Sequence, residues 1–173
     1  MMDELVVERI NEIWLEFGGL RFSVYHTRDF GSTIRVFGRV GDEWREVVRF
    51  DDFVDVPHWH APADDDRQMN LDVSEVGEPL EFYLHTLTER LPEILPKVGF
   101  GDAVGTLDQE QLRRHVPLIR AATDSVLPEG FSRVPGTSLQ DADPVRAESR
   151  AKGLELFAEY LRERGLDESK ASL

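Results

Sequence analysis

The chain has 173 residues, of which 34 are acidic and 20 are basic, so its formal net charge at pH 7 is -14. With 40% hydrophobic and 31% charged residues, its composition is typical of a soluble globular protein with one domain and room for a helical appendage. The absence of cysteine excludes disulfides, iron–sulfur clusters and zinc sites built on thiolates. No apolar run approaches the roughly 20 residues of a membrane span. The N-terminus is acidic rather than signal-like, so we expect a cytoplasmic protein without membrane contact.

The acidic charge is concentrated in the middle of the chain. Residues 51–105 carry 13 acidic and 3 basic side chains, whereas the segments on either side each have a net charge of only -2. A charge this concentrated repels nucleic acid or attracts cations. A well-solvated acidic surface explains the same numbers, and the charge alone does not choose between these interpretations.

The first segment, residues 3–17, has apolar residues at helical spacing. Ile10, Ile13 and Phe17 recur every three or four positions, and two glycines follow the last of them as a helix C-terminal cap would. The spacing predicts a helix.

Three predicted strands come next, at residues 20–26, 33–40 and 44–51, joined by short polar turns that are typical of an antiparallel meander. Side chains alternate between the two faces of a strand. The predicted apolar face consists of Leu20, Phe22, Val24, Ile34, Val36, Val40, Trp44, Val48 and Phe50. The predicted opposite face consists of Arg21, Ser23, Tyr25, Arg35, Phe37, Arg39, Arg45, Val47, Arg49 and Asp51.

The arginines make this second face locally basic within an acidic protein. Arg35, Arg39 and Arg49, together with the aromatic Tyr25, are therefore candidates for contacts to the phosphates and bases of RNA. The alternative is an ordinary solvated face on which each arginine pairs with a neighbouring acid.

The remaining elements are predicted from turn and capping signals. Residues 52–72 are rich in loops, with a short strand at Met69–Val73 that rejoins the sheet, and a helix follows at 78–95. Another helix opens at Thr106, and the last one runs from Asp143 to Gly165.

These elements predict an α+β fold: an antiparallel sheet of three to five strands covered by helices, with a helical C-terminal region. We expect residues 1–104 to form the α+β core and residues 105–173 the helical region, with a linker at about 127–142. The narrow apolar stripe of the last helix favours docking of a protein partner over membrane contact.

The segment whose residues are best suited to metal binding or catalysis contains His58 and His60, which are bracketed by prolines. In extended backbone the two imidazoles point to the same side, roughly 7 Å apart. Such a pair can bind one metal ion or act as a general acid and base. The densest cluster of aspartates in the chain surrounds it.

Two assignments follow from this clustering. The catalytic candidates are His58, His60 and Asp51, with the carboxylate orienting an imidazole. The metal-binding candidates are His58, His60 and Asp55, and imidazole ligands favour zinc, manganese or nickel over calcium. The alternative is a polar loop whose histidines cap backbone groups.

Residues 20–73 resemble the TumE-like family of small toxin–antitoxin proteins, which have a compact antiparallel sheet followed by a proline–histidine motif. The matching positions are Phe50, Asp51, Pro57, His58 and His60. In this sequence Trp59 separates the two histidines, which departs from the family's pattern. The resemblance implies an RNA-directed toxin.

Three functions from different classes are therefore open. The protein is an RNA-cleaving or RNA-binding protein that uses the arginine face and the His/Asp residues, a metal-binding protein or metal-dependent hydrolase, or a non-catalytic interaction module. A net charge of -14 counts against the first, because affinity for a polyanion comes largely from phosphate neutralisation.

Overall fold

The computed structural model describes residues 9–27, 30–65, 67–127 and 144–166, and all structural statements concern these residues. The strands are β1 (Arg9–Phe17), β2 (Leu20–Thr27), β3 (Gly31–Val40), β4 (Glu43–Phe53), β5 (His58–His60) and β6 (Met69–Asn70). The helices are α1 (Val73–Val76), α2 (Pro79–His85), α3 (Leu91–Lys97), α4 (Gln109–Ser125) and α5 (Pro144–Glu163). A π-helical turn, η1 (Thr86–Arg90), joins α2 to α3, and a 3₁₀ helix, η2 (Gly101–Thr106), precedes α4.

The six strands form one sheet in the order of the sequence, and every neighbouring pair is antiparallel. The predicted α+β class is confirmed. The expected three to five strands are corrected to six, because β1 and the histidine-bearing β5 also join the sheet. The predicted short strand is present as β6 and pairs with β5.

The helix predicted at 3–17 is wrong for the described residues 9–17, which form β1. Gly18 and Gly19 have φ values of +63° and +79°, as in the tight turn of a β-hairpin whose central residues both have positive φ. The hairpin pairs Phe17 with Leu20, and a register shift between Ile10 and Ile13 interrupts the alternation of β1. This irregularity, with Asn11 at φ +57°, spaces the apolar residues like those of a helix.

A second register shift changes the predicted faces of β4. Val36 pairs with Val48 but Phe37 pairs with Glu46, so Val47 is an extra residue in β4. Val47 is fully buried, although simple alternation assigned it to the arginine face. Trp44 lies on the arginine face instead of the apolar one, and the guanidinium groups of Arg21 and Arg39 lie 4.5 and 5.3 Å from its ring centre.

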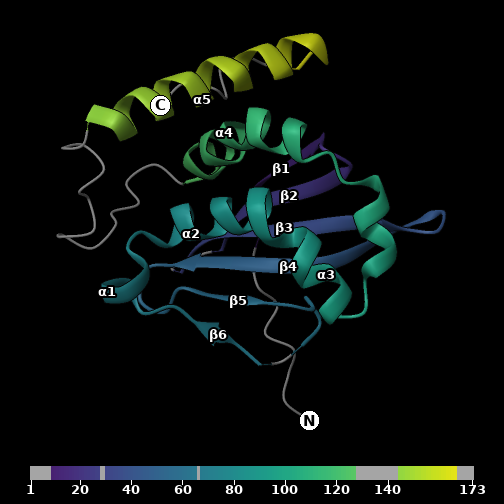
Figure 1. The fold of residues 1–173 in the computed structure, drawn as a ribbon. Coiled ribbons are helices and arrows are strands. Elements are labelled where there is room, and N and C mark those ends of the chain that lie inside the picture. The colour runs from purple at the N-terminus through teal and green to yellow at the C-terminus, as the bar shows by residue number, and fades with distance from the viewer. Residues whose placement is uncertain (1–8, 28–29, 66, 128–143, 167–173) are drawn as a thin grey trace.

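Helices α2, α3 and α4 cover one face of the sheet, and α5 lies across α4 on the side away from the sheet (Figure 1). The buried cluster between these layers is continuous from Phe22 and Phe50 in the sheet to Leu112 in α4 and Phe157 in α5. It therefore includes side chains from both sides of the predicted domain boundary at residue 104.

The C-terminal helix packs against its own chain. Phe157 and Leu161, from the apolar stripe that predicted a partner, are buried, and the hydroxyl of Tyr160 bonds to the carbonyl oxygen of Trp14 (3.3 Å). The predicted linker at 127–142 lies outside the described residues except for its first residue.

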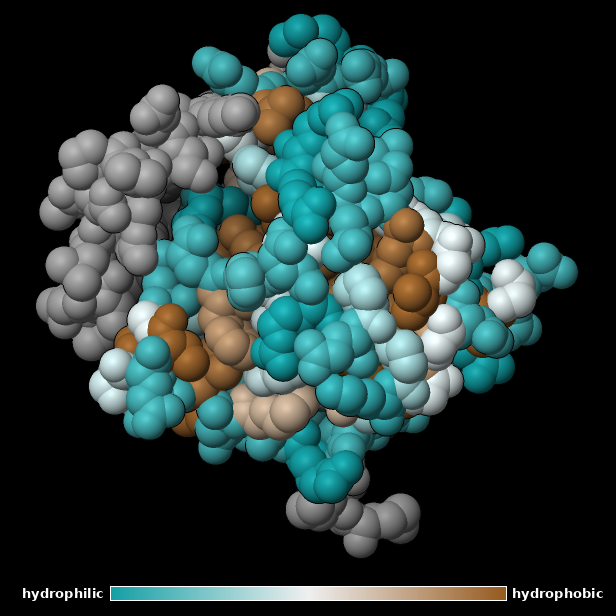
Figure 2. Space-filling model, viewed as in Figure 1, coloured by the Kyte–Doolittle hydropathy of each residue, from teal (hydrophilic) through white to brown (hydrophobic). Residues whose placement is uncertain are grey.

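The face of the molecule that carries the helices is mostly hydrophilic, and hydrophobic residues reach its surface in separate small patches (Figure 2). Among the described residues, no helix has the length and apolar character required to cross a membrane.

Candidate metal centre on the open face of the sheet

Strand register brings the polar side chains of the sheet together in two neighbouring rows. Residues that are paired across antiparallel strands lie on the same face. The first row consists of Tyr25, Thr33, Asp51 and His58, and the second consists of Ser23, Arg35, Arg49 and His60. Six of the predicted site residues therefore share one part of one face. Arg39 does not lie in these rows, because it pairs with Trp44 near the outer end of the β3–β4 hairpin.

The alternation of β5 decides which side of the sheet the histidines face. Trp59 points into the core, where its ring stacks on Phe50 (centroids 5.9 Å apart) and meets the edge of Phe82 from α2 (6.0 Å). His58 and His60 must then point to the face opposite the helices. The hydroxyl of Tyr83 in α2 is within hydrogen-bond distance of the carbonyl oxygens of Asp51 (3.0 Å) and His58 (3.2 Å), and so fastens β4 and β5 to the helical layer.

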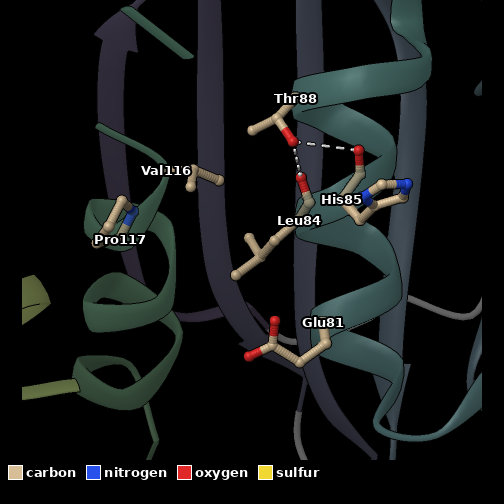
Figure 3. A pocket seen from close by; sticks show the side chains of 6 residues that line it. All are labelled: Glu81, Leu84, His85, Thr88, Val116 and Pro117. Carbon is tan, nitrogen blue, oxygen red and sulfur yellow. Dashed lines mark hydrogen bonds between the residues drawn. The ribbon is translucent and has the colours of Figure 1, made fainter. Parts of the chain in front are cut away.

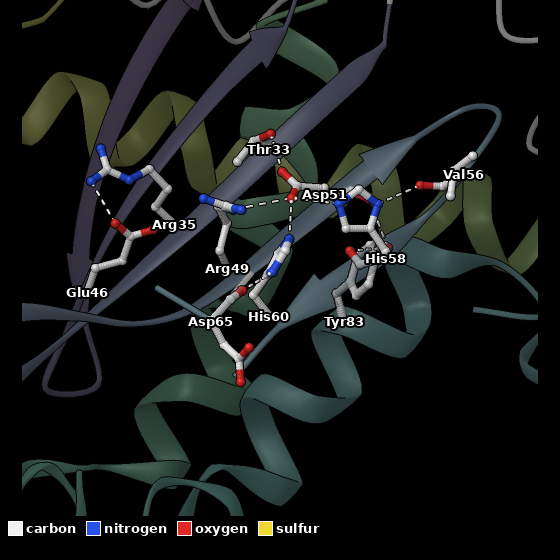
Figure 4. Close-up of polar contacts among 10 residues, drawn as sticks. All are labelled: Thr33, Arg35, Glu46, Arg49, Asp51, Val56, His58, His60, Asp65 and Tyr83. Atoms are coloured by element: carbon white, nitrogen blue, oxygen red, sulfur yellow. Dashed lines mark hydrogen bonds and ion pairs between the residues drawn. The ribbon is translucent and has the colours of Figure 1, made fainter. Parts of the chain in front are cut away.

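The two imidazoles converge on one carboxylate oxygen (Figure 4). Nε2 of His58 lies 3.2 Å from Oδ2 of Asp51, and Nε2 of His60 lies 3.5 Å from the same oxygen. One potential ligand atom from each of the three residues lies within 4.8 Å of the other two. All three residues are at most 4% exposed. The structure thus brings Asp51 to the histidine pair, whereas Asp55 lines a pocket that adjoins His58.

The other ring nitrogens define the chemistry of this cluster. Nδ1 of His58 lies 2.7 Å from the carbonyl oxygen of Val56, and Nδ1 of His60 lies 2.7 Å from the carbonyl oxygen of Asp65. A carbonyl oxygen only accepts hydrogen bonds, so each Nδ1 carries a proton. In a neutral imidazole the Nε2 atom then has a lone pair that faces the carboxylate of Asp51, whereas a protonated His58 donates a hydrogen bond from Nε2 to that carboxylate. The buried Nε2 of His60 has no hydrogen-bond partner among the described residues.

Charge interactions favour a cation between these groups. Burial favours the neutral form of Asp51, but hydrogen bonds from His58 and Thr33 and the charge of Arg49 outweigh it, so the pKa of Asp51 is lowered. Burial also disfavours the charged form of His58, yet its hydrogen bond to Asp51 prevails and raises the pKa of His58. Either a proton or a metal ion can supply the positive charge.

The predicted RNA-contacting residues are already engaged within the protein. Nε of Arg49 donates to Oδ2 of Asp51 (3.2 Å), and Arg35 forms an ion pair with Glu46 (2.8 Å). Tyr25 is buried, which raises the pKa of its hydroxyl. This arrangement matches the alternative expectation of a face whose arginines pair with acids.

The groups that orient the side chains of Asp51, His58 and His60 were not identified from the sequence. The hydroxyl of Thr33 donates to Oδ1 of Asp51 (2.7 Å), and the two carbonyl groups described above fix the imidazoles. Thr33 could have been found, because it alternates with Arg35 on the same face. The carbonyl contacts could not, because they depend on the path of the loops around β5.

Two hollows lie near functional groups. A pocket of about 390 Å³ adjoins His58 and includes Asp55 in its wall. The other, of about 240 Å³, lies between α2 with η1 and α4 (Figure 3) and is lined by Glu81, Leu84, His85, Thr88, Val116 and Pro117. The hydroxyl of Thr88 bonds to the carbonyl oxygens of Leu84 and His85 (both 3.2 Å), and Glu81 pairs with Arg120. The Thr88 hydroxyl and the Glu81 carboxylate in this second hollow therefore already bond to groups of the protein.

Comparison with known proteins gives a family but no activity. No curated protein and no solved structure matches the chain. A family model described as a domain of unknown function, DUF7700, matches residues 13–123, which run from β1 into α4 and include Asp51, His58 and His60. Because this match covers more than half of the sequence, the chain belongs to the DUF7700 family.

Proposed function

We propose that this protein binds one divalent transition-metal ion through Nε2 of His58, Nε2 of His60 and the carboxylate of Asp51. The observation that carries the proposal is the pair of Nδ1 contacts to carbonyl oxygens. When both imidazoles are neutral, these contacts leave two Nε2 lone pairs that face one carboxylate in a buried site, and a bound cation replaces the proton that otherwise joins His58 to Asp51. Metal-ligating histidines commonly donate their second ring nitrogen to such a carbonyl group.

The separations of the ligand atoms support this proposal. Zinc binds imidazole nitrogen and carboxylate oxygen at about 2.0–2.2 Å, and tetrahedral angles then place two ligand atoms roughly 3.3–3.5 Å apart. The two nitrogens lie 3.2 and 3.5 Å from Oδ2 of Asp51, close to these separations. Imidazole with carboxylate suits zinc, manganese, iron or nickel. Three protein ligands leave a coordination position for water, the arrangement found in hydrolytic zinc sites.

Direct metal titration tests the proposal. Protein stripped with EDTA and dialysed is expected to take up about one equivalent of zinc in isothermal titration calorimetry. His60→Gln is expected to weaken this binding at least about 100-fold, because it removes a ligand and not only an orienting group. His85→Gln is the matched control, since His85 is exposed and lies on the far side of the sheet in α2.

Two outcomes of this titration would contradict the proposal. One is the absence of zinc, manganese, iron and nickel binding to the stripped protein. The other is binding that His60→Gln and His85→Gln weaken equally, since the metal would then lie outside the Asp51–His58–His60 cluster.

As a second candidate we propose RNA cleavage without a metal, in line with the resemblance to TumE-like toxins. The row that contains His60 also contains Arg35 and Arg49, so arginines flank the imidazoles. In this function an imidazole transfers the proton and Asp51 orients it. The burial of the histidines and the ion pairs of both arginines favour the metal function over this one.

An RNA cleavage assay in EDTA separates the two functions. If the second candidate is correct, the metal-free protein cleaves labelled RNA, and His58→Ala lowers the rate by about 100-fold or more, the typical contribution of a positioned acid or base. Arg49→Ala is expected to weaken RNA binding, whereas Arg113→Ala, which removes an exposed arginine paired with Glu89, serves as the control. Absence of cleavage in EDTA contradicts the second candidate.

A further inference from the structure

Among the described residues, the pocket beside His58 shares only that residue with the proposed metal centre. Its wall consists of Phe30, Phe53, Asp55, Val56, His58 and Gln68. The imidazole of His58 forms the partition: its Nδ1 bonds to the carbonyl oxygen of Val56, a pocket residue, while its Nε2 faces Asp51. A molecule in this pocket therefore contacts His58 from the side away from the metal ligands.

Backbone contacts hold the aromatic part of the pocket in place. The amide of Phe30 donates to the carbonyl oxygen of Thr27 (3.1 Å), and the carbonyl oxygen of Phe30 accepts from the amide of Val54 (2.9 Å). The next residue, Gly31, has φ +140°, and a Cβ atom there would lie 2.3 Å from the carbonyl oxygen of Asp52. Only glycine fits this approach to β4. The backbone that carries Phe30 is therefore held against β4.

The apolar groups of the pocket face solvent. The rings of Phe30 and Phe53 have centroids 5.4 Å apart, and the edge of Phe53 meets His58 at 5.4 Å. Phe30 is 55% exposed and Val56 is 47% exposed, which is unusual for large apolar side chains that lie together. A ligand that covers them gains the free energy of burying apolar surface.

The charge of the pocket selects the kind of ligand. Asp55 is exposed, and within the described part of the chain no basic side chain pairs with it. The described residues of the wall include no lysine or arginine, and the surrounding segment 51–105 has 13 acidic and 3 basic residues. Faces of aromatic rings attract cations, and a carboxylate adds to this attraction. We propose that this pocket binds a small organic ammonium cation, with its charged group between the phenylalanine rings and the Asp55 carboxylate.

A quaternary ammonium compound tests this site without competing for a metal ion, because its charged nitrogen has no lone pair to offer a metal. Choline and its neutral isostere 3,3-dimethylbutan-1-ol are titrated into the full chain in EDTA, and amide and side-chain NMR shifts are followed. Choline is expected to bind at least about tenfold more tightly than the alcohol. Shift changes are expected at Phe30, Phe53 and Gln68.

Two exposed variants and a control locate the binding. Asp55→Asn and Phe30→Ala are each expected to weaken choline binding about tenfold, while Asp64→Asn, which removes an exposed aspartate outside the pocket, leaves it unchanged. Equal binding of choline and the alcohol, no binding of choline, or equal effects of Asp55→Asn and Asp64→Asn overturns the proposal. Because EDTA is present throughout, these results are independent of whether the protein binds a transition metal.

Discussion

Saturating zinc is expected to raise the Tm of the EDTA-stripped protein by roughly 10 °C. A ligand that binds only the native state stabilises it by about 4 kcal/mol when its concentration is 1,000 times its Kd. In a chain of this length 1 kcal/mol shifts Tm by about 2–4 °C. The site cannot exist in the unfolded chain, because β4 and β5 must pair before Asp51 meets the histidines.

The double variant His58→Ala/His60→Ala is expected to lose this shift, as measured by differential scanning calorimetry. His85→Gln should keep it in full. Equal shifts for the wild type and the double variant would place the stabilising metal elsewhere in the protein. Magnesium provides a further comparison, since two imidazoles bind it poorly and the expected shift is small.

Phe50→Ala is expected to destabilise the protein by about 3–5 kcal/mol, the usual cost of removing a buried phenylalanine. The side chain is fully buried, and its ring lies 4.9 Å from that of Tyr83 and 5.9 Å from that of Trp59. It therefore fills the space between α2 and the strands that carry Asp51 and the histidines. The loss is measured as the change in the free energy of unfolding by urea.

Phe30→Ala is the matched control for this measurement, because it makes the same change at a residue that is 55% exposed. Its cost is expected to stay below about 1 kcal/mol, as is usual for surface positions. A loss at Phe50 as small as the one expected at Phe30 would show that the sheet and the helical layer do not depend on the packing of Phe50.

Much of the sheet could be predicted from its alternation and its turns. The three strands that follow Gly19 lie where their patterns placed them, because short polar turns leave an antiparallel meander few other pairings. The apolar side chains of residues 9–17 have helical spacing, which predicts a helix. In the structure a strand with a register shift produces the same spacing. A double glycine ends a helix and turns a hairpin equally well.

The site could be predicted in part. The same-side placement of His58 and His60 follows from extended backbone alone, and Asp51 could be placed on the arginine face by alternation. The choice between Asp51 and Asp55 could not be made from the sequence, since it depends on the register that pairs Asp51 with His58. In that register Phe50 is paired with Trp59 and their rings stack, which is a contact between two strands that the sequence pattern does not show.

The extra residue Val47 divides β4 into two parts whose chemistry is set separately. From Val48 onward the register with β3 has no further shift, and odd-numbered side chains face away from the core. This part of β4 supplies Phe50 to the core and Asp51 to the candidate metal centre. Before Val47 the even-numbered side chains face away from the core instead, so Trp44 lies among the arginines on the outer surface. Changes in the β3–β4 hairpin tip are therefore expected to alter the aromatic and cationic surface without moving Asp51. The bulge thus keeps the outward side chains of both parts of β4 on the same face of the sheet.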